Sequence, residues 1–194
     1  MTDKNYWNQR YLDDNAPWDA GSITTPLAHY IDGLPDKSIH ILIPGAGFAH
    51  EGAYLYNKGF TNVFICDWAP AVIEAFQQAN PDFPKEQLIC GDFFKIEQQF
   101  DLIIEQTFFC AMPPKFRQPY VDTTARLLKP GGMIVGLLFA QEFEKDGPPW
   151  GGTKPLYEKL FETKFDIIEM DLAQNSIKPR AGSELFIRLR KKSV

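Results

Sequence analysis

The residues of this chain best suited to chemistry are two glycines and an aspartate, each at the end of an apolar run. Residues 39–44 lead into Gly45-Ala46-Gly47, and Asp67 closes a second apolar run. Glycines let the backbone approach a ligand closely because they lack a Cβ, and a carboxylate can accept hydrogen bonds from both ribose hydroxyls. The spacing is typical of a nucleotide-cofactor site, whereas the glycine pair alone also fits a turn that only links strand to helix.

The residue after the glycine pair distinguishes between cofactors. A dinucleotide site has a third glycine where this chain has His50, whereas the Gly-x-Gly-x-Gly of S-adenosylmethionine enzymes places it at Ala49, a small replacement. We therefore expect S-adenosylmethionine. Two alternatives stay open. One is a nicotinamide-dependent reductase, although this chain lacks the Tyr-x-x-x-Lys pair of such enzymes. The other is a module that binds the cofactor without catalysis.

Alternating strands and helices are needed to position these residues. Apolar runs predict strands, and apolar residues at helical spacing predict helices. The predicted strands are 39–43, 62–67, 87–90, 100–104, 133–139, 165–171 and 183–189, and the predicted helices are 50–57, 70–79, 115–128 and 153–163. Continuous apolar strands between helices predict a mostly parallel sheet covered on both faces.

Two local patterns refine this scheme. Residues 129–132 (Lys-Pro-Gly-Gly) predict the end of a helix before the fifth strand. Residues 183–189 alternate apolar and polar side chains, which predicts an antiparallel last strand at the margin of the sheet, with the basic cluster Arg188, Arg190, Lys191 and Lys192 on a solvated edge.

Length and composition favour one intracellular domain. The chain has 194 residues, 44% of them hydrophobic, without a long linker, so we expect a single domain over 1–194. No apolar run is long enough to span a membrane and no signal peptide is evident, which predicts a cytoplasmic protein. The three cysteines are expected to be buried, and the three histidines give no metal-ligand pattern, so no metal is expected. A net charge of −5 disfavours a nucleic-acid partner.

Several longer motifs resemble those of one family. They are residues 7–11 (Trp-Asn-Gln-Arg-Tyr), 16–21 (Ala-Pro-Trp-Asp-Ala-Gly), 43–47 (Ile-Pro-Gly-Ala-Gly), 91–94 (Gly-Asp-Phe-Phe), 108–112 (Phe-Phe-Cys-Ala-Met), 128–132 (Leu-Lys-Pro-Gly-Gly), 147–150 (Gly-Pro-Pro-Trp) and 179–184 (Pro-Arg-Ala-Gly-Ser-Glu). Together they resemble the class I S-adenosylmethionine-dependent methyltransferases, in the thiopurine methyltransferase-like group that includes halide and thiol methyltransferases. The resemblance implies an α/β fold: a Rossmann-like three-layer sandwich with a seven-stranded, mostly parallel sheet and an antiparallel last strand.

The resemblance also implies a cofactor site. An aromatic lid segment over 1–35 would fold over the cofactor bound to a core over 36–194, with Asp67 on the ribose and Asp92 and Phe93 at the adenine. The full set implied for cofactor binding is Trp7, Tyr11, Trp18, Gly45, Gly47, Asp67, Trp68, Asp92, Phe93 and Gln106.

The acceptor implied by the resemblance is a small soft nucleophile: a thiol, a thiopurine-like heterocycle or a halide. Such acceptors need little general-base help. The acceptor-side candidates are Glu105, Phe108, Trp150, Arg117 and Arg180. Glu105 is the one carboxylate expected there, and it can equally cap the following loop. Either arginine can hold an anionic acceptor, although single arginines more often form surface ion pairs. We expect a monomer or a weak homodimer.

Departures from the halide enzymes put the acceptor in question more than the cofactor. Tyr11 stands where those enzymes have Trp, and Gln106 and Trp150 stand where they have Tyr. The last two positions are those at which the resemblance implies that methyl donor and acceptor meet.

Overall fold

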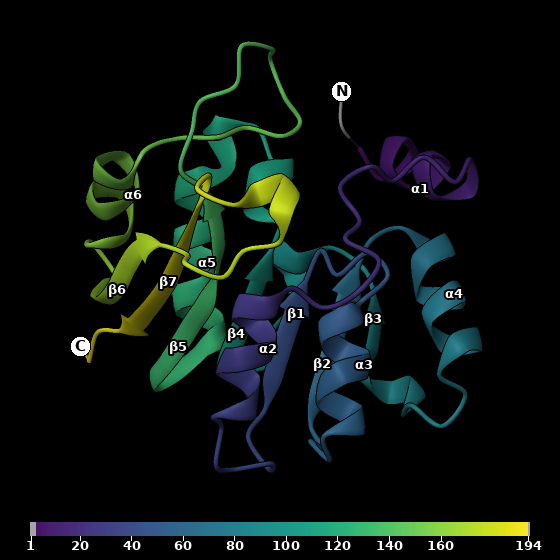
Figure 1. Cartoon of the computed structure of the whole chain (residues 1–194). Helices are drawn as coiled ribbons and strands as arrows, with labels where there is room; N and C mark the ends of the chain where they lie inside the picture. Colours follow the sequence, from purple (N-terminus) through teal and green to yellow (C-terminus); the bar gives the residue numbers. More distant parts are fainter. Residues whose placement is uncertain (1–2, 194) are drawn as a thin grey trace. The chain divides into compact units, whose positions relative to one another are not determined.

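The computed structural model describes residues 3–193, in which strands and helices alternate as predicted (Figure 1). The chain divides into two compact units, Met1–Ile96 and Glu97–Val194. The single domain expected over 1–194, with its division at residue 35, stays a prediction.

The first unit is built on three parallel strands in the order β3-β2-β1. They are β1 (Ile41–Pro44), β2 (Val63–Asp67) and β3 (Leu88–Cys90). All four residues of β1 are buried, as a strand covered on both faces requires. The carboxyl ends of β1 and β2 therefore lie side by side, with Pro44 paired to Cys66 next to Asp67.

Four helices accompany these strands. They are α1 (Lys4–Leu12), α2 (Thr25–Asp32), α3 (His50–Asn57) and α4 (Pro70–Ala79). Helices α2 and α3 lie side by side (Figure 1), and α4 packs on β2 and β3. The predicted bounds of α3 and α4 are confirmed: Pro70 occupies the first turn of α4, where its missing N–H costs nothing, and Val72, Ile73 and Phe76 form the buried face. Helices α1 and α2 fall within the segment expected to be a lid and were not predicted.

The second unit contains four strands in the order β4-β5-β7-β6. They are β4 (Phe100–Gln106), β5 (Leu128–Phe139), β6 (Phe165–Leu172) and β7 (Glu184–Lys191), with helices α5 (Arg117–Leu127) and α6 (Lys154–Phe161). Strands β4 and β5 are parallel, whereas β7 is antiparallel to both of its neighbours. The predicted α/β class, with mostly parallel strands and an antiparallel last strand, is confirmed.

The predicted place of the last strand at the margin is wrong. Strand β7 pairs with β5 on one side and β6 on the other, so β6 is the outer strand of this unit. Its alternation reflects one fully buried face, with Leu185, Ile187 and Leu189 at most 3% exposed. Arg188 does not lie on a free edge, because its Nη1 is 3.5 Å from Oε2 of Glu169 on β6.

Strand β5 begins five residues earlier than predicted, at Leu128 in place of Met133. Helix α5 runs from Arg117 to Leu127, two residues shorter at its start and one at its end than predicted, and residues 129–132 lie within β5. The pairing with β4 shifts between Phe100 and Leu102, which face Leu128 and Met133 respectively. Gly131, with φ of 75°, supplies the left-handed residue that this irregular stretch needs.

An aromatic cluster fills the core of the second unit. Phe109, Tyr120, Tyr157, Phe161 and Phe165 are each at most 1% exposed. The Phe109 ring lies 5.1 Å from Tyr120 and 5.7 Å from Tyr157, in edge-to-face geometry, measured between ring centroids. These contacts fix the short helix η3 (Phe109–Ala111) that follows β4.

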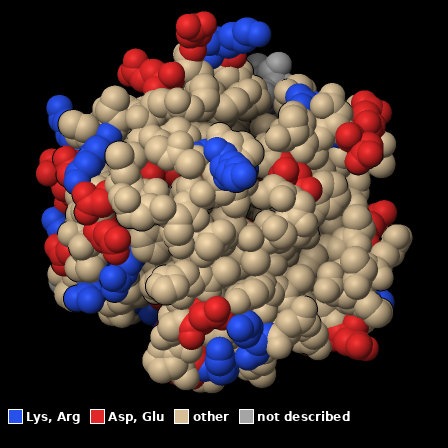
Figure 2. All heavy atoms as spheres, in the orientation of Figure 1, with Lys and Arg blue, Asp and Glu red and all other residues tan. Residues whose placement is uncertain are grey.

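The burial of the cysteines, the absence of a membrane span and the distribution of charge were also considered in the sequence. Cys66 and Cys110 are buried as predicted, but Cys90 is exposed because it ends the outer strand β3. No helix within residues 3–193 combines the length and the apolar character that a membrane span requires. Acidic and basic side chains are interspersed on the face drawn in Figure 2.

Candidate functional site

The turn after β1 has the backbone conformation expected for a ligand-binding loop. Gly45 and Gly47 have φ of 56° and 52°, and Ala49, just before α3, has φ of 53°. Three left-handed residues in five reverse the chain tightly between β1 and α3. Ala49 thus adopts the conformation that the third glycine of a Gly-x-Gly-x-Gly turn would adopt more easily.

Asp67 lies directly beside this turn. Its Oδ2 accepts a hydrogen bond from the backbone N–H of Gly47 at 3.0 Å, and its Oδ1 accepts one from Ala69 at 2.9 Å. The residue is 6% exposed, and burial raises its pKa while these backbone donors oppose the rise. The backbone N–H of Trp68 also donates to this carboxylate. An ionised carboxylate has about four lone-pair sites, so about one remains for a hydroxyl donor of a ligand.

An aromatic cluster from the N-terminal segment packs over the same turn. The Trp18 ring lies 5.2 Å from Trp7 and 5.7 Å from Tyr11, and Tyr11 lies 5.5 Å from Phe48. A Cβ on Gly47 would be 2.9 Å from the Tyr11 hydroxyl, so that hydroxyl lies against the glycine. Burial and the nearby Asp67 raise the pKa of Tyr11, whereas a hydrogen bond from Trp18 lowers it. Tyr11 is therefore a neutral donor or acceptor in this cluster.

Polar contacts join the N-terminal segment to helices α3 and α4 of the same unit. Asn8 on α1 accepts a hydrogen bond at 3.0 Å from the backbone N–H of Ala71, in the first turn of α4. Nε2 of His50 lies 2.7 Å from Oδ1 of Asp19. The first contact satisfies one of the free N–H groups at the start of α4. Asn8 was not among the predicted site residues, and nothing in its local sequence singles it out.

The other predicted cofactor residues are more scattered. Trp68 is 37% exposed beside Asp67, while Phe93 is 4% exposed and its side chain lies in the core. Asp92 caps the short helix η2 (Phe93–Lys95) by accepting from the backbone N–H of Phe94 at 3.0 Å. Gln106 ends β4 and belongs to the second unit. The structure thus brings together Trp7, Tyr11, Trp18, Gly45, Gly47 and Asp67, which we call the cofactor-side cluster.

On the acceptor side, Glu105 is a buried cap. Its Oε1 accepts from the backbone N–H groups of Phe108 and Phe109 at 2.9 and 2.8 Å, and its Oε2 accepts from the Tyr120 hydroxyl at 2.7 Å. Glu105 is 0% exposed, and burial raises its pKa to about 7 against the effect of these donors. The capping role weighed for Glu105 is confirmed, and every carboxylate oxygen already has a protein donor.

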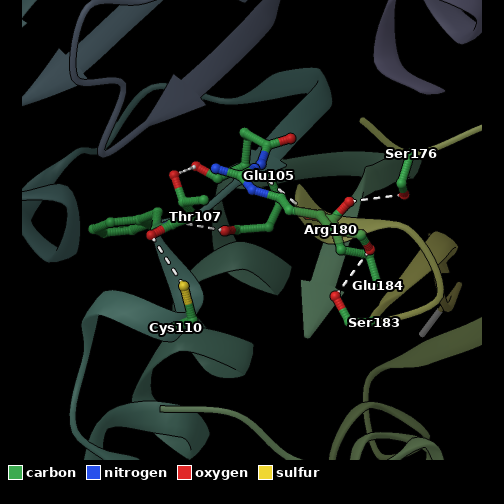
Figure 3. Close-up of polar contacts among 9 residues, drawn as sticks. Glu105, Thr107, Cys110, Ser176, Arg180, Ser183 and Glu184 are labelled. Carbon is green, nitrogen blue, oxygen red and sulfur yellow. Dashed lines mark hydrogen bonds and ion pairs between the residues drawn. The ribbon is translucent and has the colours of Figure 1, made fainter. Parts of the chain in front are cut away.

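The turn that Glu105 caps is strained. Thr107 has φ of 61°, a left-handed conformation that is unfavourable for a β-branched side chain. Its hydroxyl donates to the carbonyl of Gln106 at 2.7 Å, and its own carbonyl accepts from the Cys110 thiol at 3.4 Å (Figure 3). The Phe108 ring follows this turn, 6.1 Å from Tyr120. Sequence reasoning missed Tyr120 as the partner of Glu105. The available signal was that a buried carboxylate needs a hydrogen-bond donor.

Arg180 takes part in a polar cluster at the start of β7 (Figure 3). Its Nη1 lies 3.5 Å from Oε1 of Glu184, and the Ser176 hydroxyl donates to Oε2 of Glu184 at 2.8 Å. The side chains of Arg180 and Glu184 are 11% and 3% exposed. Burial raises the pKa of Glu184, and Ser176 and Arg180 oppose the rise. Arg180 is therefore a partly buried partner of an acid, not the exposed arginine of a surface ion pair.

Trp150 lies on a loop that is joined to helix η3. Its backbone N–H donates to the carbonyl of Cys110 at 2.7 Å, and its indole Nε1 donates to Asp146 at 2.9 Å. Arg117 donates from Nη2 to the carbonyl of Gly151 at 2.6 Å. The second unit therefore brings Glu105, Phe108, Arg117 and Trp150 around η3, and we call these four residues the acceptor-side cluster. Among residues 3–193, no group of three or more His, Cys, Asp or Glu side chains is placed to hold a metal ion.

Comparison with known proteins gives consistent results. A family model described as "Thiopurine S-methyltransferase (TPMT)" matches residues 2–186. "Probable thiol methyltransferase 2" of Arabidopsis thaliana is 28% identical over 97% of this chain and 85% of its own length. "Thiocyanate methyltransferase 1" of Brassica oleracea is 27% identical, with 95% and 84% covered. "Thiopurine S-methyltransferase" of Vibrio vulnificus is 24% identical, with 83% and 82% covered.

Solved structures share the fold at low identity. A TehB-like SAM-dependent methyltransferase from Corynebacterium glutamicum has a TM-score of 0.69 and 22% identity, with 97% of this chain and 98% of that chain covered. A magnesium protoporphyrin IX methyltransferase from Synechocystis, solved with bound SAM, has a TM-score of 0.75 and 11% identity, with 97% and 95% covered. The Rossmann-like methyltransferase fold expected from the sequence is confirmed.

Proposed function

This chain belongs to the thiopurine S-methyltransferase family, and on that premise we propose that its acceptor is a small sulfur or halide nucleophile that arrives already as an anion. The enzyme is an S-adenosylmethionine-dependent methyltransferase that acts on small soft nucleophiles. The two alternatives, a nicotinamide-dependent reductase and a cofactor-binding module without catalysis, are not favoured by these relatives.

The residues of the cofactor-side cluster fit the cofactor. The lone-pair site of Asp67 that its backbone donors leave free suits a ribose hydroxyl, and the Tyr11 hydroxyl beside Gly47 adds a polar group at the same turn. S-adenosylmethionine, when bound, supplies a methyl group activated on a sulfonium. Trp7, Tyr11 and Trp18 would exclude water from it, and their ring faces suit a positive charge, at about 0.5 to 2 kcal/mol for each ring.

The partners of Glu105 are the observation that carries the proposal about the acceptor. Glu105 is the one carboxylate among the candidates of the acceptor-side cluster, and its oxygens accept from Phe108, Phe109 and Tyr120. A general base must reach the proton that it removes, and a side chain that is 0% exposed, with both oxygens already hydrogen-bonded within the protein, does not. An acceptor that ionises in solution needs no such base, because a thiol has a pKa near 8.5 and thiocyanate and halides are anions at every working pH.

The roles of the aromatic side chains follow from this chemistry. We assign Phe108 and Trp150 to the walls that meet the acceptor, because displacement at a methyl group depends on alignment and exclusion of water more than on proton transfer. Gln106 and Trp150 replace the tyrosines of the halide enzymes, so the choice among thiols, thiopurines and halides belongs to these positions.

Transfer of labelled methyl groups tests the proposal. The panel contains thiocyanate, iodide and a series of thiols of different pKa, each assayed from pH 6 to 9. The rate with each thiol should rise with the thiolate fraction, the rate with thiocyanate should stay flat, and Glu105→Gln should leave both profiles in place. A thiol profile that follows one enzyme group for all thiols, and that disappears in Glu105→Gln, would overturn the proposal.

The acceptor class, the location and the oligomeric state of the enzyme are further parts of the proposal. A small-molecule acceptor is consistent with the family. The cytoplasmic location and the monomeric or weakly dimeric state expected from the sequence stay predictions. Light scattering over a range of protein concentrations measures the oligomeric state.

A further inference from the structure

Arg117 occupies an unusual position at the start of α5. Its Nη2 donates to the carbonyl of Gly151 at 2.6 Å, and its guanidinium lies 5.5 Å from the centre of the Phe109 ring and 5.8 Å from that of Tyr157. Its Nε is buried and has no hydrogen-bond partner among the described residues. A guanidinium that packs against two aromatic rings and donates to a carbonyl has little freedom to rotate, so the direction of its remaining N–H donors is restricted.

The carbonyl that Arg117 binds belongs to the loop that carries Trp150. This loop, residues 147–152, is fastened on both sides of that carbonyl. The backbone N–H of Trp150 donates to Cys110 at 2.7 Å, and that of Gly152 donates to Gln141 at 2.9 Å. Arg117 therefore supplies the middle one of three consecutive attachments.

The loop has little room to shift around this point. A Cβ at Gly151 would overlap the Gln141 carbonyl oxygen, and one at Gly152 would lie 2.7 Å from the Tyr157 hydroxyl. Tyr157 in turn donates to the carbonyl of Phe139 at 3.0 Å, at the end of β5. The backbone of Gly151 and Gly152, which follows Trp150, thus packs against Gln141 and Tyr157, and Arg117 donates a hydrogen bond to it.

We propose that Arg117 is a positioning residue that fixes the Trp150 loop, and so sets the acceptor wall, in place of holding an anionic acceptor itself. The proposal rests on the proposed function, in which Trp150 contacts the acceptor. A charged donor to a carbonyl makes a hydrogen bond stronger than a neutral one, and its loss frees the loop at its centre. An acceptor anion bound to Arg117 would use the N–H donors that Gly151 leaves free, so its binding is tested separately by the kinetics below.

Hydrogen exchange tests the attachment without any acceptor. In Arg117→Met, the amides of Trp150 and Gly152 should exchange at least about tenfold faster than in the wild type, while amides of β4 and α6 keep their rates. Arg117→Lys keeps the charge but not the planar fork, and should give intermediate rates. If Arg117→Met does not fold, Arg117→Lys alone provides the test. Arg126→Lys, at an exposed position near the other end of α5, is the control and should change nothing.

Kinetics then distinguish positioning from anion binding. In Arg117→Met, kcat/KM should fall by the same factor for thiocyanate and for the neutral sulfur acceptor thiourea, with the Kd of S-adenosylhomocysteine unchanged. Unchanged exchange in residues 147–152, or a loss confined to thiocyanate, would overturn the proposal. Faster exchange in an enzyme that methylates no member of the acceptor panel would contradict the proposed function and leave the attachment standing.

Discussion

Replacing Glu105 with glutamine keeps the shape of the side chain and removes its ionisable proton. Oε1 of glutamine can still accept from the backbone N–H groups of Phe108 and Phe109. The Tyr120 hydroxyl, which now donates to Oε2, can accept from the new amide instead. The variant therefore tests the charge of the carboxylate separately from the turn that it caps.

The direction of the effect follows from the pKa of Glu105. Burial raises this pKa from 4.5 to about 7, so the folded protein holds the proton more tightly than the unfolded chain. The stability that comes from this proton is fully present below pH 4.5 and is lost as the pH rises through about 7. At about 1.36 kcal/mol per pKa unit the full loss is about 3 kcal/mol, of which about 2.5 kcal/mol falls between pH 5 and pH 8.

Urea unfolding at pH 5, 6, 7 and 8 measures this loss. The free energy of unfolding of Glu105→Gln, taken relative to that of the wild type, should rise by about 2.5 kcal/mol from pH 5 to pH 8. Glu162→Gln, at an exposed position after α6, is the control and should follow the wild type. Parallel pH curves for the wild type and Glu105→Gln would refute the reasoning, because they would mean that this carboxyl group titrates alike in the folded and unfolded chains.

Three further substitutions test the two clusters. Asp67→Ala should raise the Kd of S-adenosylhomocysteine roughly 10- to 150-fold in calorimetry, since it removes a charged hydrogen-bond acceptor, and an unchanged Kd would remove Asp67 from the site. Trp150→Ala should change the KM for acceptors and leave the Kd of S-adenosylhomocysteine unchanged; the opposite pattern would mean that Trp150 contacts the cofactor. Gly47→Ala should lower the free energy of unfolding by about 1 to 2 kcal/mol, because φ is 52° there, and unaltered thermal unfolding would contradict this.

Local patterns in the sequence were sufficient for much of the fold. The bounds of α3 and α4 were predicted as the structure has them, because an amphipathic repeat and a proline in the first turn depend on neighbouring residues only. The same holds for the turn at Gly45 and Gly47 and for the place of Asp67, since parallel strands bring their carboxyl ends to one edge.

The sequence failed where pairing between distant segments decides the outcome. Alternation in residues 183–189 showed that one face of β7 is buried, but it could not show that β6 pairs with the outer side of β7. Helix α1, which has no buried residue, lacks the apolar stripe by which helices are recognised and is held by contacts such as that between Asn8 and Ala71.

The amino-acid sequence alone determined the family motifs, the order of strands and helices along the chain and the residues that suit a cofactor, since all of these reside in short runs of neighbours. Only the tertiary structure decided which partners Glu105 and Arg117 have. Their partners, Tyr120 and Gly151, lie 15 and 34 positions away along the chain. Burial and specific hydrogen-bond partners make Glu105 a capping carboxylate and attach Arg117 to the Gly151 carbonyl, and both arise only when distant segments pack together.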